Sequence, residues 1–278
     1  MKDTTILEQK ELDVMACGGW GTISSHSVTG AAALADYVDA KHGLLCHSLD
    51  AAYEALIRHF GAALANTAYG DYIVTAEVSE PLNSLVAVCV GAAPLFVPNC
   101  CSCGMAKLKA IEEALTSGKT VRCVTVDLLP EKIDDYKLDK LAEICKVNNV
   151  PLILNAGGYF SMKWQGKALV DFDDAVIYSL EEGSEIYTGK GGFIATKDTD
   201  VYAGAFAYHN CGRGFGEGCS LNVDEIVGGD LRVTEWTSVA AEAILETKQF
   251  SEAAPRKLVK MAGQPVFESA YAKKMTGN

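Results

Sequence analysis

The spacing of apolar positions changes along the chain, and each change marks a predicted strand or helix. Apolar residues recur with a helical period over residues 28–40, where Ala31, Leu34, Ala35 and Val38 share one face. Further helices are predicted at residues 51–64 (capped by Asp50), 82–90, 105–115, 136–148, 199–208 and 234–248. Short apolar runs predict buried strands at residues 43–46, 72–75, 95–97, 121–126, 150–154, 175–178 and 192–196.

This order of elements predicts an α/β fold, with three α/β/α layers and a mostly parallel sheet. In such sheets ligands bind beyond the carboxyl ends of the strands. The loops that leave strands at that end are therefore the candidate site segments, and they comprise residues 47–50, 77–82, 155–159 and 179–188.

One stretch, residues 81–106, carries no charge and is long enough to cross a membrane, which takes about 20 apolar residues. It contains Asn83, Pro94, Pro98 and Asn99, however, which a membrane helix does not favour. A helix, a stop at Gly91 and a buried strand account for it better. The charged start of the chain shows no signal peptide.

Composition narrows the class of protein further. The chain has 278 residues, 49% of them hydrophobic, and a net charge of -12, so we expect neither nucleic acid nor an anionic membrane as a partner. Its ten cysteines are irregularly spaced, as in a cytoplasmic protein with reduced thiols. Cys100, Cys101 and Cys103 raise the alternative of a metal site, but no second pair of ligands completes it.

Five segments carry a resemblance. In chain order they are WGTISSHSVTGAAALADYVDAKHGLLCHS, GDYIVTAEVSEPLNSLVAVCVGAAPLFVP, LDKLAEICKVNNVPLILNAGG, MKWQGKALVDFDDAVIYS, and HNCGRGFGEG with GGDLRVTEWTSVAAEAIL. Their order and spacing resemble those of the DegT/DnrJ/StrS family of sugar aminotransferases, which are pyridoxal phosphate enzymes of the type I fold. The likeness runs from about Trp20 to about Leu245.

The resemblance also locates the family's cofactor-binding lysine. In the family this lysine lies five residues before a GEGG motif and follows a Ser-Phe pair. Gly189 to Gly192 match that motif, Ser179 and Leu180 match the pair, and Ser184 falls at the lysine position. Serine cannot form an aldimine, so the resemblance implies that covalent capture of the cofactor is lost.

Other family positions are changed as well. Asn155 stands where an aspartate contacts the pyridine nitrogen, and Glu80 stands where an aromatic residue stacks on the ring. Four further positions match phosphate-binding residues. Ser48, Leu49 and Asp50 replace a Ser-Gly-Thr loop. Asp230 replaces an asparagine that reaches over from the other subunit, and Arg232 just beyond it remains.

These changes predict that the former phosphate site is acidic. Asp50 and Asp230 would both face a phosphate dianion, with Glu80, Glu181 and Glu182 nearby in the same loops, and each like charge at about 4 Å costs roughly 4 kcal/mol. We therefore expect no bound pyridoxal phosphate. Lys190 could replace the lost lysine, but a solvated turn lysine is the preferred interpretation.

The chain also departs from the family at its end. Family members continue into a smaller domain that closes over the substrate, whereas about 30 residues follow Lys248 here. The predicted organisation is an aminotransferase-like large domain at residues 1–248 and a short tail at residues 249–278, with the smaller domain largely missing.

Three functions remain open at this point. The favoured one is a non-catalytic homologue that forms a homodimer, or a heterodimer with a related aminotransferase, lending Arg232 or the Glu182 loop across the interface. Its candidate contact is the apolar face of helix 234–248, unless that face packs on its own domain; the face comprises Trp236, Val239, Ala240, Ala243 and Ile244. The alternatives are a pyridoxal or pyridoxamine phosphate-dependent transferase or dehydratase acting on a nucleotide-linked sugar, and a binding module with an acidic cleft.

Two other features have plainer interpretations. His209 lies in the HNCGRG segment, which the resemblance puts near a subunit interface, but a histidine satisfied within the core is the default. Gly212 to Gly218 form a glycine-rich run that follows a helix, and no helix starts at its last glycine. We therefore interpret that run as a loop rather than a phosphate cradle.

Overall fold

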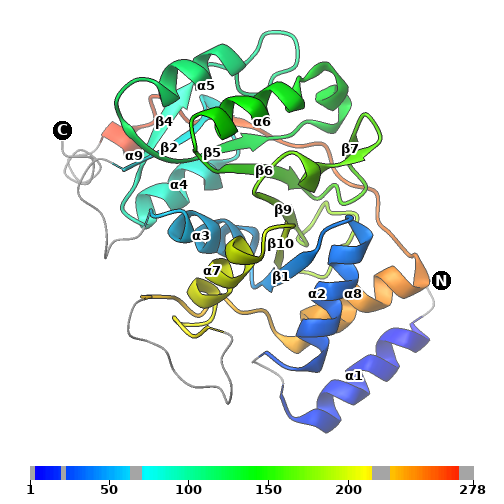
Figure 1. The fold of residues 1–278 in the computed structure, drawn as a ribbon. Coiled ribbons are helices and arrows are strands. Elements are labelled where there is room, and N and C mark those ends of the chain that lie inside the picture. The colour runs from blue at the N-terminus through cyan, green and yellow to red at the C-terminus, as the bar shows by residue number, and fades with distance from the viewer. Residues whose placement is uncertain (1–3, 20–22, 63–70, 215–225, 269–278) are drawn as a thin grey trace. The chain divides into compact units, whose positions relative to one another are not determined.

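The structure is a computed structural model, and it describes residues 4–19, 23–62, 71–214 and 226–268 (Figure 1). The chain divides into two compact units. The first comprises Met1–Ala52, Ala156–Met162 and Ile177–Pro255, and the second comprises Tyr53–Asn155, Lys163–Val176 and Arg256–Asn278. Each unit is thus assembled from three separate stretches of the chain.

The helices and strands follow the predicted alternation. Those that belong wholly or mainly to the first unit are α1 (Thr5–Cys17), α2 (Ser25–Tyr37), β1 (His42–Cys46), β9 (Ala175–Ser179), β10 (Gly192–Thr196), α7 (Thr199–His209) and α8 (Glu235–Thr247). Those that belong wholly or mainly to the second unit are α3 (Leu49–His59), β2 (Asp71–Ala76), β3 (Val78–Ser79), α4 (Pro81–Cys89), β4 (Ala93–Val97), α5 (Leu108–Leu115), β5 (Thr120–Asp127), α6 (Leu138–Val147), β6 (Leu152–Gly157), β7 (Lys163–Trp164), β8 (Lys167–Ala168), β11 (Val259–Lys260) and α9 (Pro265–Glu268). Two 3₁₀ turns, η1 (Pro130–Asp135) and η2 (Leu169–Asp171), complete it.

The large strands confirm the predicted α/β class. In the second unit their order is β6-β5-β2-β4, and each neighbouring pair is parallel. In the first unit the order is β1-β10-β9, and β1 runs antiparallel to β10 with Leu44 opposite Ile194. The MKWQGKAL segment forms a hairpin, the short antiparallel pair β7 and β8.

Helices from both ends of the chain pack together in the first unit. α8 packs against both α1 and α2 (Figure 1). The fully buried carboxylate of Glu235 accepts hydrogen bonds from the backbone N–H groups of Ser24, His26 and Ser27 at 2.8–3.3 Å. A carboxylate at this place accepts hydrogen bonds from the otherwise unpaired donors of the first turn of α2. Its negative charge is also attracted to the positive end of the helix dipole.

The apolar face predicted for helix 234–248 mostly packs on its own unit. Val239 and Ala243 are buried, at 0% and 6% exposure, whereas Trp236 is 38% exposed. On the same helix Glu242 accepts from Lys10 of α1 at 2.7 Å. The interpretation that this face serves the chain's own core is therefore correct for Val239 and Ala243.

The uncharged stretch forms a helix and a strand, as predicted. α4 ends before Gly91, whose φ of 89° suits glycine, and the following strand β4 pairs with β2. Within the described ranges no helix has the length and apolar character needed to cross a membrane.

One local prediction is wrong, and one helix is missing from the predictions. The sequence predicts that Asp50 caps the helix after β1, but α3 begins at Leu49, and the hydroxyl of Ser48 accepts the N–H of Ala51 at 3.1 Å. Asp50 therefore lies in the first turn, where its charge favours the helix dipole. The helix α1 is not predicted at all, because its apolar residues show too weak a helical period.

The residues after Lys248 are held by backbone hydrogen bonds in both units. In the first unit, the N–H of Ser251 donates to Glu185 at 2.8 Å and that of Ala254 to Gly183 at 2.9 Å. In the second unit, the N–H of Met261 donates to Glu77 at 2.7 Å, and β11 pairs with β3. The division into a large domain at residues 1–248 and a tail stays a prediction.

Candidate functional site

Four polar side chains meet at the carboxyl ends of the parallel strands in the second unit. Asp127 ends β5 and Asn155 lies opposite it on β6, because the register pairs these two residues. Glu80 and Asn83 come from the start of α4. Asn155 donates through Nδ2 to Asp127 at 2.8 Å and to Glu80 at 3.0 Å, and Asn83 donates to Asp127 at 2.8 Å.

Arg256 completes this group from far along the chain. Its Nη2 lies 2.7 Å from Oε1 of Glu80 and 3.2 Å from Oδ1 of Asp127. Its Nη1 donates to the carbonyl oxygens of Leu128, at 2.8 Å, and of Asn155. We call Glu80, Asp127, Asn155 and Arg256 the Arg256 cluster. The guanidinium of Arg256 donates to two carboxylates and two carbonyls. This set of acceptors suits the several N–H donors that an arginine presents in one plane.

The cluster is closed to solvent and unbalanced in charge. The side chains of Arg256 and Asp127 are each 3% exposed, and that of Glu80 is 20% exposed. Burial raises the pKa of Asp127 to about 6, and the Glu80 carboxylate acts in the same direction while Arg256 opposes it. The single guanidinium of Arg256 thus pairs with two carboxylates, those of Glu80 and Asp127.

A cavity of about 410 Å³ lies in the first unit, where α3 begins. It is lined by Ser48, Asp50, Glu181, Glu182, Gly189 and Lys190. The structure therefore brings together three of the acidic residues that the sequence places near the former phosphate loop. Lys190 is exposed and lies in the same cavity, so three carboxylates face one ammonium group.

Ser184 sits in a tight turn next to this loop. Its side chain is almost fully buried and its hydroxyl donates to the carbonyl of Ser179 at 2.6 Å. The backbone of Gly158 packs directly on it, since a Cβ added to Gly158 would lie 2.6 Å from the Cα of Ser184. Ser184 therefore has a short, buried side chain that bonds to the backbone of its own turn.

The glycines of the same segment serve two different purposes. Gly189 has a φ of 98°, as a turn requires. Gly192 lies in β10, and a Cβ there would come within 2.2 Å of the carbonyl oxygen of Ser48. Turn geometry therefore explains Gly189 but not Gly192, whose role is to let β10 approach the start of α3.

Asp230 and Arg232 form an ion pair within one short segment. Nε of Arg232 lies 2.7 Å from Oδ1 of Asp230, and their side chains are 17% and 64% exposed. The hydrogen bond from Arg232 lowers the pKa of Asp230. The segment pairs with the end of β1, where the N–H of His47 donates to Leu231 at 3.0 Å. The guanidinium of Arg232 is thus engaged by an acid on its own strand.

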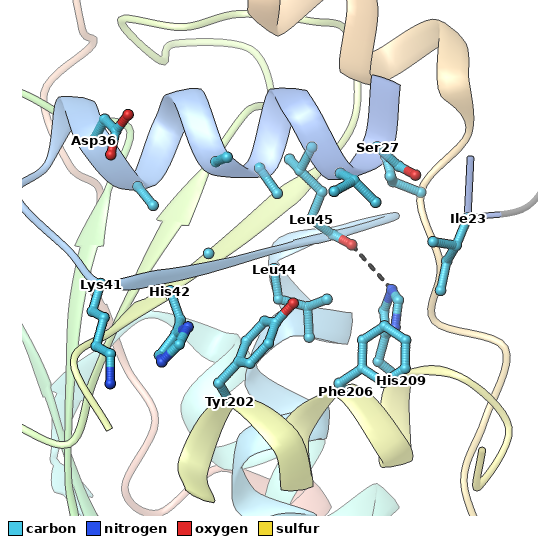
Figure 2. Close-up of a pocket in the computed structure, with 16 residues that line it drawn as sticks. Ile23, Ser27, Asp36, Lys41, His42, Leu44, Leu45, Tyr202, Phe206 and His209 are labelled. Carbon is cyan, nitrogen blue, oxygen red and sulfur yellow. Dashed lines mark hydrogen bonds between the residues drawn. The ribbon is translucent and has the colours of Figure 1, made fainter. Parts of the chain in front are cut away.

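A second cavity in the first unit, of about 240 Å³, runs along β1 between α2 and α7 (Figure 2). Most of its lining is apolar, with Lys41 and His42 at one end and Ser27 and His209 at the other. His209 is 2% exposed, and its Nε2 lies 3.1 Å from the carbonyl oxygen of Leu45. Its Nδ1 has no hydrogen-bond partner among the described residues.

The surroundings of His209 keep its ring neutral. Burial lowers the pKa of His209 to about 4, because a charged imidazole loses its hydration there. The interpretation of His209 as a core histidine agrees with this burial. The glycine-rich run at residues 212–218 falls largely outside the described residues.

Comparison with known proteins identifies the family. The sequence profile of the DegT/DnrJ/EryC1/StrS aminotransferase family matches residues 3–262. This chain belongs to that family. Among its relatives is GDP-perosamine synthase of Caulobacter vibrioides, which is 26% identical over 174 residues, or 62% of this chain and 44% of the relative.

Solved structures of similar fold agree. Helicobacter pylori PseC, an aminotransferase involved in the biosynthesis of pseudoaminic acid, superposes with a TM-score of 0.75 at 18% identity, over 90% of this chain and 64% of PseC. The E. coli GDP-4-keto-6-deoxy-D-mannose-3-dehydratase with bound hydrated PLP gives a TM-score of 0.73 at 15% identity, over 88% and 66%. The chain spans half or less of the length of the curated relatives it matches.

The family positions inferred from the sequence fall into the two units. Ser48, Leu49, Asp50, Ser179, Ser184, Asp230 and Arg232 belong to the first, and Glu80 and Asn155 belong to the second. Sequence reasoning misses Asp127 and Arg256. Asp127 carries a usable signal, a charged residue directly after a buried apolar strand. Arg256 carries none, since nothing local distinguishes it from a solvated tail arginine.

Proposed function

We propose that this chain is a non-catalytic member of the DegT/DnrJ/EryC1/StrS family and does not use pyridoxal phosphate. It would be a non-catalytic homologue of the family's aminotransferases or a partner subunit of one of them. The observation that carries the proposal is the Arg256 cluster. Two positions that hold the cofactor ring in the family are bonded to each other and to an arginine of the same chain.

The residues of the second unit do not fit the cofactor ring. In the family, one of these positions stacks on the ring and the other contacts its nitrogen. Here Nδ2 of Asn155 lies 3.0 Å from Oε2 of Glu80, a hydrogen-bond distance that leaves no room for a ring between them. The guanidinium of Arg256 bonds to Glu80 and to the carbonyl of Asn155 as well. An added ring would have to displace a buried, fully bonded cation.

The residues of the first unit do not fit the phosphate and the aldehyde either. Ser184 offers a hydroxyl where an amine is needed, and that hydroxyl is already bonded to Ser179. Asp50, Glu181 and Glu182 line the nearby cavity, and Lys190 is the one cation among its described lining residues. Each carboxylate within about 4 Å of a phosphate would oppose binding by roughly 4 kcal/mol.

The proposal predicts that cofactors leave the protein's stability unchanged. A ligand that binds only the native state at 100 times its Kd stabilises that state by about 2.7 kcal/mol. Thermal unfolding should therefore be followed with pyridoxal phosphate, pyridoxamine phosphate or neither. We expect the same Tm in all three. A rise of several degrees with either form would overturn the proposal.

The same measurement addresses the alternative function. Relatives of this chain include a dehydratase solved with hydrated PLP, and a dehydratase or transferase acting on a nucleotide-linked sugar would need one of the two cofactor forms. A Tm that rises with pyridoxamine phosphate alone would favour that alternative. No residue of the Arg256 cluster supports it.

For the partner role we propose a dimer, either of two copies or with an intact family member. The exposed apolar side chains of α1, Leu12 and Met15, each 58% exposed, are better candidates for the contact than Val239 or Ala243. Light scattering after size-exclusion chromatography, with and without a co-expressed full-length family aminotransferase, tests this. A monomer under both conditions would contradict the partner role. It would not bear on the proposal that the chain binds no cofactor, which the Tm measurement tests. The cytoplasmic location stays a prediction.

A further inference from the structure

A tight turn directly after β4 holds two cysteines three residues apart. The N–H of Cys100 donates to the carbonyl of Met105 at 2.7 Å, and the N–H of Gly104 donates to that of Cys100 at 2.9 Å. These bonds close a loop of six residues, Cys100 to Met105. The second bond joins residues four apart, and within this turn the side chains of Cys100 and Cys103 are close enough to share a hydrogen bond, which puts the two thiols within reach of a disulfide.

The turn is fixed in place by the residue before it. The Asn99 side chain donates to the carbonyl oxygens of Gly104, at 2.7 Å, and Val78, at 2.8 Å, and its Oδ1 accepts the N–H of Val78 at 2.9 Å. Gly104 has a φ of 77°, which glycine adopts without strain. Because the turn is anchored to β3, the two thiols are held together without any change in the fold.

The two thiols differ in exposure and in acidity. Cys100 is partly exposed, whereas Cys103 is 3% exposed. The hydroxyl of Ser102, 3.2 Å from Sγ of Cys100, and the neighbouring backbone N–H groups lower the pKa of Cys100 to about 6. Burial raises the pKa of Cys103, and the two thiols share a hydrogen bond. An accessible thiolate beside a buried thiol is the arrangement of a dithiol that exchanges disulfides.

A metal site is the other use of such a turn. It needs about four ligands, and among the described residues no group of three or more His, Cys, Asp or Glu side chains could hold an ion. The observations therefore favour redox chemistry over metal binding.

We propose that Cys100 and Cys103 form a thiol–disulfide exchange site that takes small disulfides of the glutathione class. The Cys100 thiolate attacks one sulfur of the disulfide, the S–S bond breaks, and one thiolate leaves. Cys103 then loses its proton to solvent and attacks the Sγ of Cys100. This releases the second thiolate and closes the Cys100–Cys103 bond. Two protein thiols are oxidised and one disulfide is reduced to two thiols.

This site is independent of the proposed function. All of its residues belong to the second unit, and none belongs to the Arg256 cluster or to the acidic cavity. Its test therefore needs neither cofactor nor partner.

The experiment uses the full chain, fully reduced and then incubated with glutathione disulfide. Mass spectrometry of peptides from a protease that cleaves after Phe96 separates this turn from Cys89. We expect the wild type to lose two hydrogen atoms within the fragment that holds Cys100 and Cys103. Cys103→Ser should instead accumulate a glutathione adduct on Cys100. Cys100→Ser should form no internal disulfide at this turn, and its Cys101 should gain a glutathione adduct no faster than the other exposed cysteines.

The rate provides a second readout. At pH 6 a thiol of pKa about 6 is about half ionised, against about 0.3% for an ordinary thiol. A thiolate of lower pKa is also a weaker nucleophile, which lowers its reaction rate roughly tenfold. The net rate is therefore about tenfold higher than that of an ordinary thiol. Adduct formation on Cys103→Ser at pH 6 should therefore be about tenfold faster than at the exposed cysteines of Cys100→Ser.

Cys101→Ser is the matched control, because Cys101 lies in the same turn, is exposed, and has no part in the exchange. It should form the internal disulfide as the wild type does. Since Cys103 is buried, Cys103→Ala replaces Cys103→Ser if the serine variant does not fold. A disulfide that involves Cys101, a wild-type turn that stays reduced, or equal rates in the two variants would each overturn the proposal.

Discussion

The guanidinium of Arg256 and the carboxylate of Asp127 form a buried ion pair, with Nη2 3.2 Å from Oδ1 and each side chain 3% exposed. A buried pair repays its desolvation only when its remaining donors and acceptors are also satisfied. Here Asn83 and Asn155 donate to Asp127, and two carbonyls accept from Arg256. The pair is therefore an anchor for the segment that follows Pro255.

Removing the arginine should destabilise the protein strongly. Arg256→Ala leaves the carboxylates of Asp127 and Glu80 without their cation, and breaking a buried pair in this way costs about 3–5 kcal/mol. Urea unfolding at pH 7.5 measures the loss. The loss should shrink at pH 5, because burial raises the pKa of Asp127 to about 6 and the carboxyl is largely neutral below that value.

Arg58→Ala is the matched control. Arg58 pairs with Glu54 four residues earlier at 2.8 Å, and their side chains are 17% and 26% exposed. Pairs of this kind contribute about 0.3–0.5 kcal/mol. If Arg256→Ala costs no more than Arg58→Ala, the Arg256 cluster does not anchor the chain.

The strands and their sequence along the chain could be predicted because each depends on a local apolar run; the order of the strands within the sheet is not predicted. The predicted strand 121–126 and the observed β5 differ by one residue at each end. Asn155 and Glu80 could be assigned to the site for the same reason, since each follows a predicted strand. The partner of both, Arg256, lies 129 residues beyond Asp127, and no local pattern encodes such a contact.

The acidic cavity could be predicted from the sequence only in part. The sequence places Asp50, Glu181 and Glu182 on loops at strand ends, and the structure brings them to one cavity. The cap of α3 is misassigned because Ser48 and Asp50 are both good capping residues two positions apart. Which of them caps depends on where the backbone leaves β1, and that is set by packing against β10.

That packing gives a second prediction, at Gly192. A Cβ there would lie 2.2 Å from the carbonyl oxygen of Ser48, so Gly192→Ala must push β10 away from the start of α3. We expect a loss of about 1–3 kcal/mol in the free energy of unfolding. Gly214→Ala is the control, because no atom of the described residues lies within 4 Å of its added Cβ. Equal stability of the two variants would contradict the close approach.

His209 gives a prediction about pH. Burial lowers the pKa of His209 to about 4, whereas an unfolded histidine titrates near 6.5. Below pH 6.5 the unfolded chain binds a proton that the native protein does not, so stability falls as the pH drops from 6.5 to 4. The shift corresponds to a loss of up to about 3 kcal/mol over that window.

His209→Gln removes this titration and keeps a donor for the carbonyl of Leu45. Relative to the wild type, the variant should gain up to about 3 kcal/mol between pH 7 and pH 4. Urea unfolding of both proteins at these pH values measures the difference. A constant difference between the two curves would show that His209 has the same pKa in the native protein as in the unfolded chain.

The last prediction concerns the position that matches the family's lysine. Restoring the amine with Ser184→Lys should not restore cofactor binding, because Glu80 and Asn155 stay bonded to each other and to Arg256. Ser184 is 1% exposed, so the larger side chain must also displace its neighbours, at a cost of about 1–3 kcal/mol. Incubation with pyridoxal phosphate, reduction with borohydride and peptide mapping locate any modified amine. We expect only exposed lysines to react, equally in both proteins, with Lys190→Ala identifying the contribution of the cavity lysine. Selective modification at position 184 would mean that the site still accepts the cofactor, and the proposal that this family member works without it would be wrong.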